Sequence, residues 1–427
     1  MSHTDTYRVA PLDGPVDTDV VVPGSKSVAN RALVCAALAD GTSELDGVAP
    51  GDDTAAMLDC LQLLGIAVGA TGRQDSVLVD GRGGTLAPGP LVLPTRLAGT
   101  TSRFVTALAA LGPGPYTVDG LPPLRTRPMT PLHDALVALG GALVPGERWG
   151  HLPVQVSGPL DGAAGVVAIR GDVSSQYITA LMLIGPYLPD GLQIQLTTPL
   201  VSRSYLGITA AVMASFGVDG VTVADDVVTV PAGRYRPTRY TVEPDASSAS
   251  YPLAAAAIAG GTVHVAGLTD RSLQGDARFA DVLGDMGCEV VVDGRGTTVS
   301  RLGGLRGIDI DMVDLSDLVP TLAVVAPFAV SPTTIRGVGF IRGKESDRLG
   351  DLCRELRAAG VRATETDDGL VIEPGFPHAA RLATHHDHRL AMSFGLLGLV
   401  VDGIEIDDPA VVSKSWPDYW SMLEDLR

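Results

Sequence analysis

Cysteine and aromatic residues are scarce in this sequence. It has four cysteines in 427 residues, and aromatic residues make up 4% of the chain. The cysteines are widely scattered and show no CxxC or other metal-ligand spacing: Cys35, Cys60, Cys288 and Cys353. This pattern argues against a disulfide framework and favours buried, inert thiols in a reduced cytoplasm. We expect no metal and no cofactor.

Positive charge is also in short supply. The 31 Lys and Arg residues face 49 Asp and Glu residues, which gives a formal net charge of −18. Such an acidic balance argues against nucleic acid or an anionic membrane as a partner. Small anionic ligands stay open, because a site can be locally basic on an acidic protein.

The sequence contains neither a secretory signal nor a long apolar run. Residues 1–14 are polar and acidic, without the basic n-region and apolar h-region of a signal peptide. The longest apolar stretch, residues 318–330, is too short to span a membrane and contains two prolines. We therefore expect a cytoplasmic protein with no membrane partner.

What the sequence does contain is a repeat. Polar residues start small-residue helices at intervals of 74, 75, 71, 71 and 71 residues: Ser25, Gly99, Ser174, Asp245, Ser316 and Asp387. A second series of glycines ends other helices at intervals of 76, 76, 70 and 73 residues: Gly65, Gly141, Gly217, Gly287 and Gly360. Because the two independent series agree, the chain is predicted to consist of six repeats of about 71 residues with two helices each.

The two helices of each repeat differ in composition. One kind, such as LAAAAIAGG at 253–261, is apolar all round and should be buried. The other kind, such as residues 348–360, is amphipathic and should cover the outside. Short alternating strands supply sheets for both kinds of helix. The sequence therefore predicts an α/β fold of two three-repeat domains, with the chain crossing between them in residues 232–245.

Several cations stand where helices are predicted to start. A helix N-terminus presents free N–H groups and the positive end of the dipole, which suits anions and disfavours Lys or Arg. Five cations in such places therefore indicate a multiply charged anionic ligand: Lys26, Arg103, Arg127, Arg389 and Lys414. Ordinary N-capping is an adequate explanation for Asp53, Asp276 and Asp347.

Two other motifs carry less weight. The segment GSKS at 24–27 has Ser where a phosphate-binding Walker loop needs Gly before Lys. The segment HHDH at 385–388 could suggest a metal, but no partner cluster appears elsewhere, and a helix start with His388 and Arg389 is the simpler interpretation.

Taken together, the motifs resemble those of the 5-enolpyruvylshikimate-3-phosphate synthases (3-phosphoshikimate 1-carboxyvinyltransferases), which are enolpyruvyl transferases. The matches run through all six repeats in order: PGSKSxxNR at 23–31, LAGTTSR at 97–103, RP at 127–128, SSQY at 174–177, SRSY at 202–205, EPDASSASY at 243–251, QGDARFADVL at 274–283, GKESDRL at 343–349, DHRLAM at 387–392 and SKSWPDY at 413–419. Matches at the right spacing over the whole chain are far more specific than a single motif.

The resemblance implies a particular domain organisation. The family has two inside-out α/β domains of three repeats each, with buried helices and helix N-termini that face an interdomain cleft holding the active site. Its first strand belongs with the C-terminal half, which here places residues 1–22 and 236–427 in one domain and residues 23–235 in the other. Closure of the cleft on the substrates would exclude water. The expected state is a monomer.

The resemblance also implies the substrate-binding residues. Shikimate 3-phosphate would be bound by Lys26, Ser27, Arg31, Ser174, Ser175, Gln176, Ser202, Tyr205, Asp317 and Lys344. Phosphoenolpyruvate would be bound by Lys26, Gly99, Arg103, Arg127, Gln176, Arg348, His388, Arg389 and Lys414. The chemistry agrees, because two phosphates and two carboxylates in one cleft require clustered Lys and Arg side chains.

The implied reaction is an addition followed by an elimination. The 5-hydroxyl of shikimate 3-phosphate attacks C2 of phosphoenolpyruvate while C3 gains a proton, and the tetrahedral adduct then expels phosphate. In this scheme Glu345 is the C3 acid and later the base, Asp317 steers or deprotonates the hydroxyl, and Lys26 assists proton movement at the leaving phosphate. Without the resemblance, Glu345 would be interpreted as a first-turn dipole partner and Asp317 as a residue of an N-cap region.

Three residues depart from the family pattern. Leu97 and Phe340 stand where asparagines are common, and Phe104 stands where proline is frequent. The first two changes remove polar contacts and bear on substrate affinity and on the choice of acceptor. Gly99 retains the small residue that leaves room for the inhibitor glyphosate in the family, so glyphosate sensitivity is expected.

Three alternative functions fit the sequence less well than this one. An enolpyruvyl transferase acting on UDP-N-acetylglucosamine typically has Asn after the first Lys and a reactive Cys, whereas here Ser27 follows Lys26 and residues 112–131 contain no Cys. A paralogue with a different phosphorylated or hydroxylated acceptor would fit the two missing asparagines. A non-catalytic anion-binding protein would not need the intact catalytic set.

Overall fold

Two separately packed units make up the chain. The computed structural model describes residues 6–73, 75–161 and 165–427, so the first five residues of the polar N-terminal stretch lie outside the described part. One unit, the central unit, is Gly24–Val242, and the other, the terminal unit, combines the chain up to Pro23 with Glu243–Arg427. The second crossing follows Val242, seven residues beyond the boundary at 235/236 expected from the sequence.

Strand β14 (Arg239–Thr241) explains the later crossing. It pairs in parallel with β3 (Asp40–Asp46) of the central unit. Tyr235 is buried in the core of the same unit, where its hydroxyl donates to the Leu183 carbonyl at 2.9 Å. Strand pairing is a long-range feature that local composition does not reveal, and it keeps residues 236–242 in the central unit.

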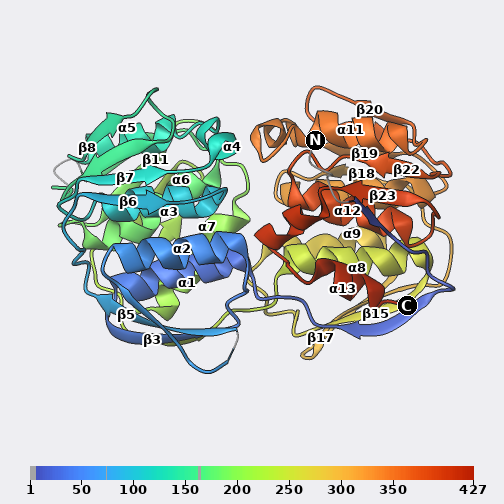
Figure 1. Ribbon diagram of the computed structural model, residues 1–427, viewed down its shortest axis with the longest axis horizontal. Helices are drawn as coiled ribbons and strands as arrows, with labels where there is room; N and C mark the ends of the chain where they lie inside the picture. Colours follow the sequence, from blue (N-terminus) through green and yellow to red (C-terminus); the bar gives the residue numbers. More distant parts are fainter. Residues whose placement is uncertain (1–5, 74, 162–164) are drawn as a thin grey trace. The chain divides into compact units, whose positions relative to one another are not determined.

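The central unit contains three four-stranded sheets of one plan, seen with their helices in Figure 1. In each sheet a parallel pair is followed by two antiparallel pairs. The strand orders are β14-β3-β5-β4, β6-β7-β9-β8 and β10-β11-β13-β12, with the bounds β4 Ala67–Ala70, β5 Ser76–Arg82, β6 Leu91–Pro94, β7 Tyr116–Asp119, β8 Ala142–Pro145, β9 Val154–Ser157, β10 Val166–Ile169, β11 Leu192–Leu196, β12 Thr222–Val223 and β13 Val227–Val230.

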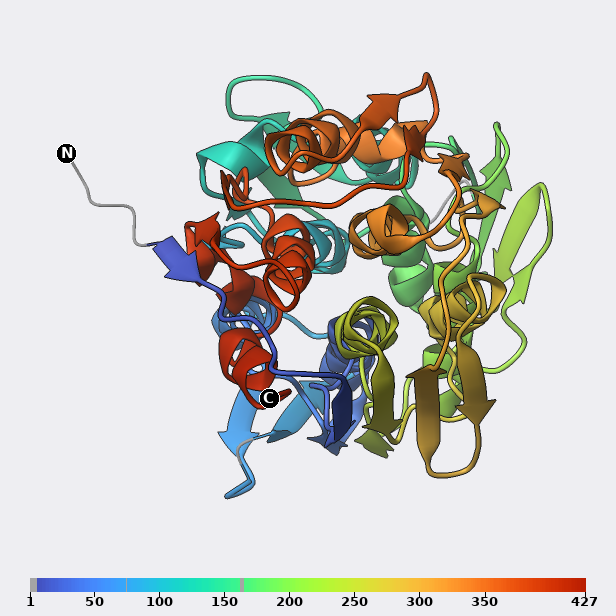
Figure 2. The ribbon, with the colours of Figure 1, turned by 90° about the vertical axis from the view of Figure 1, so that its right-hand side faces the viewer.

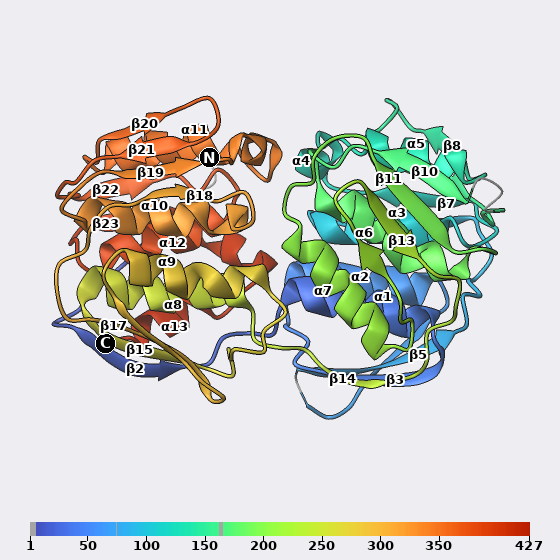
Figure 3. The same cartoon turned by 180° about the vertical axis from the view of Figure 1, so that it is seen from behind.

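Two sheets of the terminal unit follow the same plan, and its third sheet, as described, has three strands; the unit uses strands from both ends of the chain. Strand β2 (Val16–Val20) pairs in parallel with β15, beside which Figure 3 shows it, and β1 (Thr6–Arg8) pairs antiparallel with β23. The strand orders are β2-β15-β17-β16, β18-β19-β21-β20 and β22-β23-β1, with the bounds β15 Gly261–Ala266, β16 Glu289–Val292, β17 Gly296–Arg301, β18 Asp309–Asp311, β19 Thr333–Arg336, β20 Ala363–Glu365, β21 Leu370–Ile372, β22 Ala380–Leu382 and β23 Ile404–Asp407. Among the described residues, each repeat of the sequence thus corresponds to one sheet.

One helix of each repeat is buried almost throughout, as its apolar composition predicts. These inner helices pack on one another within each unit, and Figure 2 shows those of the terminal unit nearly end-on. They are α1 Lys26–Leu38, α3 Gly99–Ala109 and α6 Ser175–Ile184 in the central unit, and α8 Ala246–Ala259, α10 Val319–Val325 and α12 His388–Gly398 in the terminal unit.

The predicted starts of the inner helices are confirmed. Ser25, Ser174, Asp245 and Asp387 are N-caps whose side chains accept backbone N–H groups. Gly99 is the first residue of α3, and Ser316 opens the short 3-10 helix η3 (Ser316–Leu318) that leads into α10.

The second helices of the repeats are less completely buried. They are α2 Asp52–Leu63, α5 Thr130–Ala138, α7 Ser204–Ser215, α9 Phe279–Asp285, α11 Arg348–Ala358 and α13 Tyr419–Glu424. The predicted glycine stops after α2, α7, α9 and α11 all have positive φ angles, as a helix-ending glycine requires. After α5 the left-handed residue is Gly140 (φ 92°), and the prediction of Gly141 was wrong because two adjacent glycines fit the local pattern equally well.

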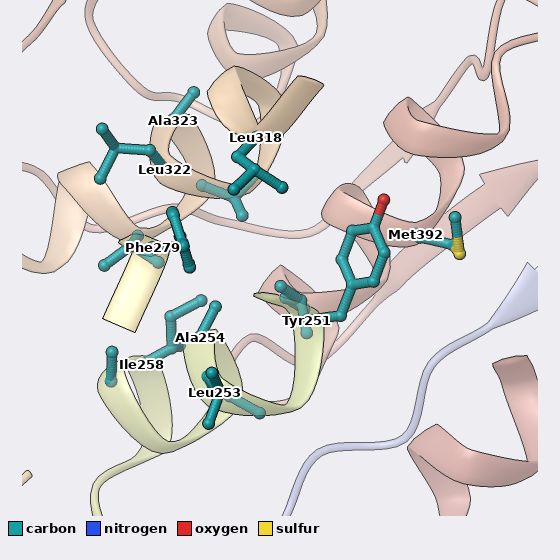
Figure 4. Packing of buried hydrophobic residues seen from close by; sticks show 14 of the residues in the cluster. Tyr251, Leu253, Ala254, Ile258, Phe279, Leu318, Leu322, Ala323 and Met392 are labelled. Carbon is teal, nitrogen blue, oxygen red and sulfur yellow. The ribbon is translucent and has the colours of Figure 1, made fainter. Parts of the chain in front are cut away.

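Apolar packing fixes where the inner helices of the terminal unit begin. Figure 4 shows Ala254 and Ile258 of α8 on the side of Phe279, and Tyr251 of the same helix on the side of Met392; all five are buried in one cluster. Complete burial of a Leu or Phe side chain contributes about 1.5–3 kcal/mol. This packing holds α8, η3 and α12 so that their N-terminal residues have defined positions.

The four cysteines are all buried and free, as their apolar surroundings predict. Burial raises the pKa of Cys35 and of Cys60 to about 12 and that of Cys353 to about 11. Thiols that are protonated at neutral pH are poor nucleophiles, so these buried cysteines are unreactive. In the described residues no helix is long and apolar enough to span a bilayer.

Candidate active site

Three carboxylates and four cations come together in the terminal unit. We call this set the terminal cluster; it consists of Asp317, Lys344, Glu345, Arg348, Asp387, Arg389 and Lys414. The residues come from segments far apart in the chain: η3, the loop between η5 (Gly339–Gly343) and α11, the starts of α11 and α12, and the end of η6 (Pro409–Lys414). With four positive and three negative groups, the terminal cluster has a small excess of positive charge.

Arg348 is the centre of the terminal cluster. Its Nε donates to Asp387 Oδ2 at 2.7 Å, its Nη1 to Asp317 Oδ1 at 2.8 Å and its Nη2 to Glu345 Oε2 at 2.8 Å. The side chain is 1% exposed. Burial alone would lower its pKa, but the three carboxylates outweigh burial and raise the pKa above its ordinary value. A single guanidinium therefore sets the positions of three acids.

Both oxygens of Glu345 are held by cations. Lys414 Nζ lies 3.0 Å from Oε1, and Arg348 occupies Oε2. The structure corrects two interpretations from the sequence: Glu345 lies in the loop before α11 and not in its first turn, and Lys414 ends η6 and does not start a helix. Both residues nevertheless reach the same cluster, and an anion that binds these cations competes with Glu345 for them.

Asp317 is ionised by its neighbours. Its Oδ2 accepts from Arg389 Nη2 at 2.9 Å, and Lys344 Nζ lies 3.9 Å from Oδ1. Burial would raise the pKa of this carboxyl, but the charges of Arg389, Lys344 and Arg348 hold the pKa well below its usual range. In this state Asp317 is a strong hydrogen-bond acceptor and a weak base, so it can orient a hydroxyl better than it can deprotonate one.

The loop that leads into α12 is held in a strained conformation. His385 and His386 have φ angles of 51° and 58°, in the left-handed region that non-glycine residues rarely adopt. His385 Nε2 lies 2.8 Å from Glu355 Oε1, and His386 Nδ1 lies 3.2 Å from Asp408 Oδ2. The two histidines thus brace the start of the helix that carries Arg389.

The third histidine and the aspartate of the HHDH segment lie at the start of α12. Within the described ranges, no group of three or more His, Cys, Asp or Glu side chains could hold a metal ion. His388, the third histidine of the segment, is 2% exposed, with Nδ1 3.7 Å from Asp387 Oδ1. Asp387 itself caps α12 by accepting from the Arg389 N–H at 2.9 Å.

Phe340 has a contact that the sequence did not predict. The Lys344 ammonium lies 5.8 Å from the centre of the Phe340 ring, within the range of a cation–π interaction. The aromatic ring therefore supports Lys344, although it offers no hydrogen bond to a ligand as an amide would.

The central unit presents the starts of its inner helices. On α1, α3 and α6 the residues that are not fully buried lie at the N-terminal end: Lys26, Ser27, Thr100 and Gln176. Gln176 Nε2 donates to Thr100 Oγ1 at 3.2 Å, which joins α6 to α3 at this end. Together with Arg31, Gly99, Arg103, Arg127, Ser174, Ser175, Ser202 and Tyr205, these residues form what we call the central cluster.

Asp53 also belongs to this cluster. The sequence analysis interpreted Asp53 as an N-cap and did not predict its contact with the cluster. Gly51 occupies the cap position of α2, and Asp53 Oδ2 lies 2.9 Å from Lys26 Nζ. The Asp53 side chain is 3% exposed. The explanation of Asp347 as an N-cap is confirmed, because its side chain accepts from the Gly350 N–H. Asp52 immediately precedes Asp53. Two consecutive acids after the helix start were the one sequence signal that Asp53 could have a role other than capping.

Arg31 is buried among neutral acceptors. Its guanidinium donates to the hydroxyls of Thr209 (2.8 Å) and Thr179 (3.3 Å) and to the carbonyls of Ser27 (2.6 Å) and Tyr205 (3.3 Å). The rings of Tyr205 and Phe104 lie 5.7 and 5.6 Å from its Cζ, and burial lowers its pKa to about 10. The role of Arg31 visible in the structure is to join α1, α6 and α7 at this site.

Gly99 leaves room for two arginines. A Cβ atom at this position would lie 2.7 Å from Arg127 Nη1 and 3.0 Å from Arg103 Nη1. Arg103 Nη1 donates to the Gly99 carbonyl at 2.9 Å, and its Cζ lies 5.9 Å from the Tyr177 ring. Any larger residue at position 99 would displace a guanidinium. Arg127 lies before α5 and Arg103 in the second turn of α3, so neither is at a helix start as predicted.

Three of the four serines of the central cluster lie at the starts of α6 and α7. Ser174 caps α6 by accepting from the Gln176 N–H at 3.3 Å, and Ser175 is the first residue of that helix. Ser202 precedes α7 with a φ angle of 54°, and its carbonyl accepts from the Tyr205 N–H at 3.2 Å. Hydroxyl groups and free N–H groups at such places suit an oxyanion.

The fold and the two clusters define a class of protein: a two-unit α/β protein whose cations and helix starts suit small polyanionic ligands. A family model described as EPSP synthase (3-phosphoshikimate 1-carboxyvinyltransferase) matches residues 12–423. The chain therefore belongs to the EPSP synthase family.

Relatives of this chain cover nearly its whole length. A 3-phosphoshikimate 1-carboxyvinyltransferase of Nostoc punctiforme is 44% identical over 98% of both chains, and one of Methanosphaerula palustris is 43% identical over 96% of this chain and 97% of the relative. Among solved structures, an EPSP synthase from Acinetobacter baumannii is similar with a TM-score of 0.82 at 23% identity, covering 99% of this chain and 98% of the other. The enolpyruvyl transferase NikO from Streptomyces tendae has a TM-score of 0.78 at 17% identity, covering 98% and 96%. The two solved structures support the α/β fold.

Proposed function

We propose that this protein transfers the enolpyruvyl group of phosphoenolpyruvate to the 5-hydroxyl of shikimate 3-phosphate and releases phosphate. This is a step of the shikimate pathway, which leads to chorismate and the aromatic amino acids. The observation that carries the proposal is the terminal cluster. In it Arg348 and Lys414 form ion pairs with Glu345, the residue predicted to transfer the proton to and from C3. Membership of the family and the names of its 40–44% identical relatives support the same reaction.

The division of roles follows from the groups in each cluster. Arg127, Arg348, Arg389 and Lys414 bind phosphoenolpyruvate, and the helix starts with Ser27, Ser174 and Ser202 bind shikimate 3-phosphate. Three of the first four residues belong to the terminal unit, and the three serines belong to the central unit, Gly24–Val242. Lys26, which pairs with Asp53, assists the proton at the leaving phosphate.

Proton transfer depends on competition for the cations. When the phosphate and carboxylate of phosphoenolpyruvate take hydrogen bonds from Arg348 and Lys414, the Glu345 carboxylate is released from them and takes up a proton from water. The resulting acid can protonate C3, and the carboxylate so formed later accepts a proton from C3 in the elimination step. The same competition weakens the hold of Arg389 and Arg348 on Asp317, whose basicity rises at the moment when the 5-hydroxyl attacks. Before the substrate binds, Asp317 acts as an acceptor that orients the hydroxyl.

A phosphate-release assay tests the function. Purified protein is given phosphoenolpyruvate together with either shikimate 3-phosphate or UDP-N-acetylglucosamine as the acceptor. Phosphate release is expected with the first acceptor and not with the second. Release with neither acceptor would contradict the proposal and favour a paralogue with another acceptor. One observation favours that second candidate: position 340, where asparagine is common in the family, is occupied by Phe340, whose ring contacts Lys344.

Inhibition by glyphosate and the assembly state complete the proposal. The space that Gly99 leaves beside Arg127 supports glyphosate binding, and a titration of the same assay is expected to show inhibition. Absence of inhibition at high glyphosate would contradict this point. The protein is proposed to act as a cytoplasmic monomer, and analytical ultracentrifugation checks its oligomeric state.

A further inference from the structure

Asp276 is a buried carboxylate beside the terminal cluster. It lies in the 3-10 helix η2 (Gly275–Arg278) and is 4% exposed. Its interpretation as an N-cap was wrong, because Gln274 occupies the cap position of η2. Among the described residues, its Oδ1 atom has no hydrogen-bond partner. A buried carboxylate with an unused oxygen is costly to the fold, which calls for a functional explanation.

A chain of hydrogen bonds links Asp276 to the terminal cluster. Ser247, the second residue of α8, donates from its hydroxyl to Asp276 Oδ2. The same Ser247 oxygen accepts from Arg389 Nη2 at 3.4 Å, and this nitrogen also donates to Asp317 Oδ2 at 2.9 Å. Ser247 is the direct bridge between Asp276 and the Arg389 guanidinium.

The charge of Asp276 decides which way the Ser247 hydroxyl points. A serine hydroxyl has one proton to donate, and a guanidinium can only donate. An ionised Asp276 accepts the serine proton, so the lone pairs of Ser247 face Arg389. A protonated Asp276 can donate to Ser247 instead, and the serine proton must then turn elsewhere and compete with the Arg389 donor.

The surroundings of Asp276 bring this change of charge near neutral pH. Burial raises the pKa of Asp276 to about 7, with a further upward contribution from Asp317. The hydrogen bond from Ser247 and the charge of Arg389 act downward, and Asp245, the N-cap of α8, acts upward. Asp317, Arg389 and Asp245 are therefore the charged groups that set its protonation.

We propose that ionised Asp276 is a positioning residue, which acts through Ser247 to hold the Arg389 guanidinium in the orientation that binds phosphoenolpyruvate. This inference rests on the proposed function, because it takes Arg389 as a ligand of that substrate. It adds to the reaction a residue that touches neither substrate.

The proposal has a consequence for stability that a purely structural role would not have. A carboxyl whose pKa is higher in the folded than in the unfolded chain contributes stability below its ordinary pKa, and this contribution is lost as the pH rises through about 7. The neutral isostere in Asp276→Asn avoids the loss. This variant should therefore melt at a higher temperature than the wild type at about pH 8, although it binds substrate less well.

The test compares Asp276→Asn with Ser247→Ala and with Asp281→Asn, an exposed acid on the neighbouring helix α9. For Asp276→Asn, we expect the KM for phosphoenolpyruvate to rise about tenfold with a smaller change in kcat, as for loss of a hydrogen bond to a charged group. The wild-type increase of kcat/KM between about pH 6 and 8 should be reduced in this variant. Ser247→Ala should raise the KM similarly without the gain in melting temperature, and Asp281→Asn should change neither quantity.

Two results would overturn the inference. One is an Asp276→Asn enzyme with the wild-type KM and pH profile, and the other is a variant that melts lower at about pH 8 and loses kcat alone. If the wild type releases no phosphate with shikimate 3-phosphate, the proposed function fails separately. Titration calorimetry with phosphoenolpyruvate then decides the role of Asp276: weaker binding by Asp276→Asn supports it, and equal dissociation constants for wild type and variant overturn it.

Discussion

The terminal and central clusters hold their cations in different ways. In the terminal cluster, Arg348 is bound to three carboxylates and Lys414 to one of them. In the central cluster, Arg31 donates to two threonine hydroxyls and two backbone carbonyls. Carboxylates can release a cation to an incoming anion and can take up a proton, whereas hydroxyls and carbonyls do neither at neutral pH. The comparison favours proton transfer at C3 by the terminal unit and a fixed positioning role for Arg31 in the central unit.

Replacement of the acid at position 345 should have the largest effect. Glu345→Gln keeps the shape of the side chain and one acceptor for Lys414 but cannot exchange a proton, so kcat should fall by about 10²–10⁴-fold. The melting temperature should stay close to that of the wild type. Phosphate release measures the effect, and Glu289→Gln on an exposed strand end is the control. Unchanged turnover would show that Glu345 does not transfer the proton and would contradict the role given to the terminal cluster.

The two buried arginines offer a direct test of the difference between clusters. Arg348→Met leaves three carboxylates without their shared cation, so the free energy of unfolding should fall by about 3–5 kcal/mol. Arg31→Met leaves neutral acceptors and should cost about 1–3 kcal/mol. Urea unfolding of both variants gives these values. Equal losses would show that the charge of the acceptors is unimportant.

Opposite pH dependences of stability distinguish the two units further. Burial lowers the pKa of His133 in α5 to about 4, and this residue is completely buried beside Trp149. The unfolded chain then binds a proton at a higher pH than the folded chain, so about 3 kcal/mol of stability is lost as the pH falls from about 6.5 to 4. In contrast, Asp276 of the terminal unit lowers stability as the pH rises.

The variant His133→Leu should no longer lose stability as the pH falls from about 6.5 to 4. Its stability should still fall as the pH rises through about 7, as in the wild type. Denaturant unfolding at a series of pH values measures both limbs, and Asp276→Asn serves as the opposite control. A His133→Leu protein with the acid sensitivity of the wild type would contradict the assignment to His133.

The smallest effect concerns the strained loop before α12. His385→Gly and His386→Gly both relieve a positive φ angle, but only the first removes a partner from the buried carboxylate of Glu355. We expect His385→Gly to be less stable than His386→Gly by about 1 kcal/mol. Thermal unfolding compares the pair, and equal stability would show that His385 does not brace the loop.

Local features of the fold could be predicted from the sequence. Helix starts at Ser25 and Asp245 were predictable because an N-cap depends on the residue itself and the next three. The choice between Gly140 and Gly141 and the boundary at Val242 depend on packing and strand pairing, which local pattern does not specify. The repeat predicted the sheets because most strands of most sheets come from one stretch of about one repeat length; β1, β2 and β14 are the strands that join from a distant part of the chain.

The sequence motifs named residues that the structure brings together, but not the contacts between them. The family motifs named Glu345, Asp317 and Arg348, but not that one guanidinium binds all three carboxylates of the terminal cluster. Asp53 and Asp276 were missed because, in sequence, an acid at a helix start looks the same whether it caps the helix or pairs with a distant group. Such pairings depend on tertiary structure, and the repeat spacing carries no information about them.

The strands at the beginning of the chain have a consequence for biosynthesis. β1 and β2 leave the ribosome long before their partners, Ile404–Asp407 and Gly261–Ala266. The central unit is one continuous segment whose strands are all synthesised once Thr241 has emerged, so it can fold while those first strands still wait for partners. A chain released early would contain a folded central unit without the candidate catalytic acids, and the terminal cluster cannot form until residue 414 has been synthesised.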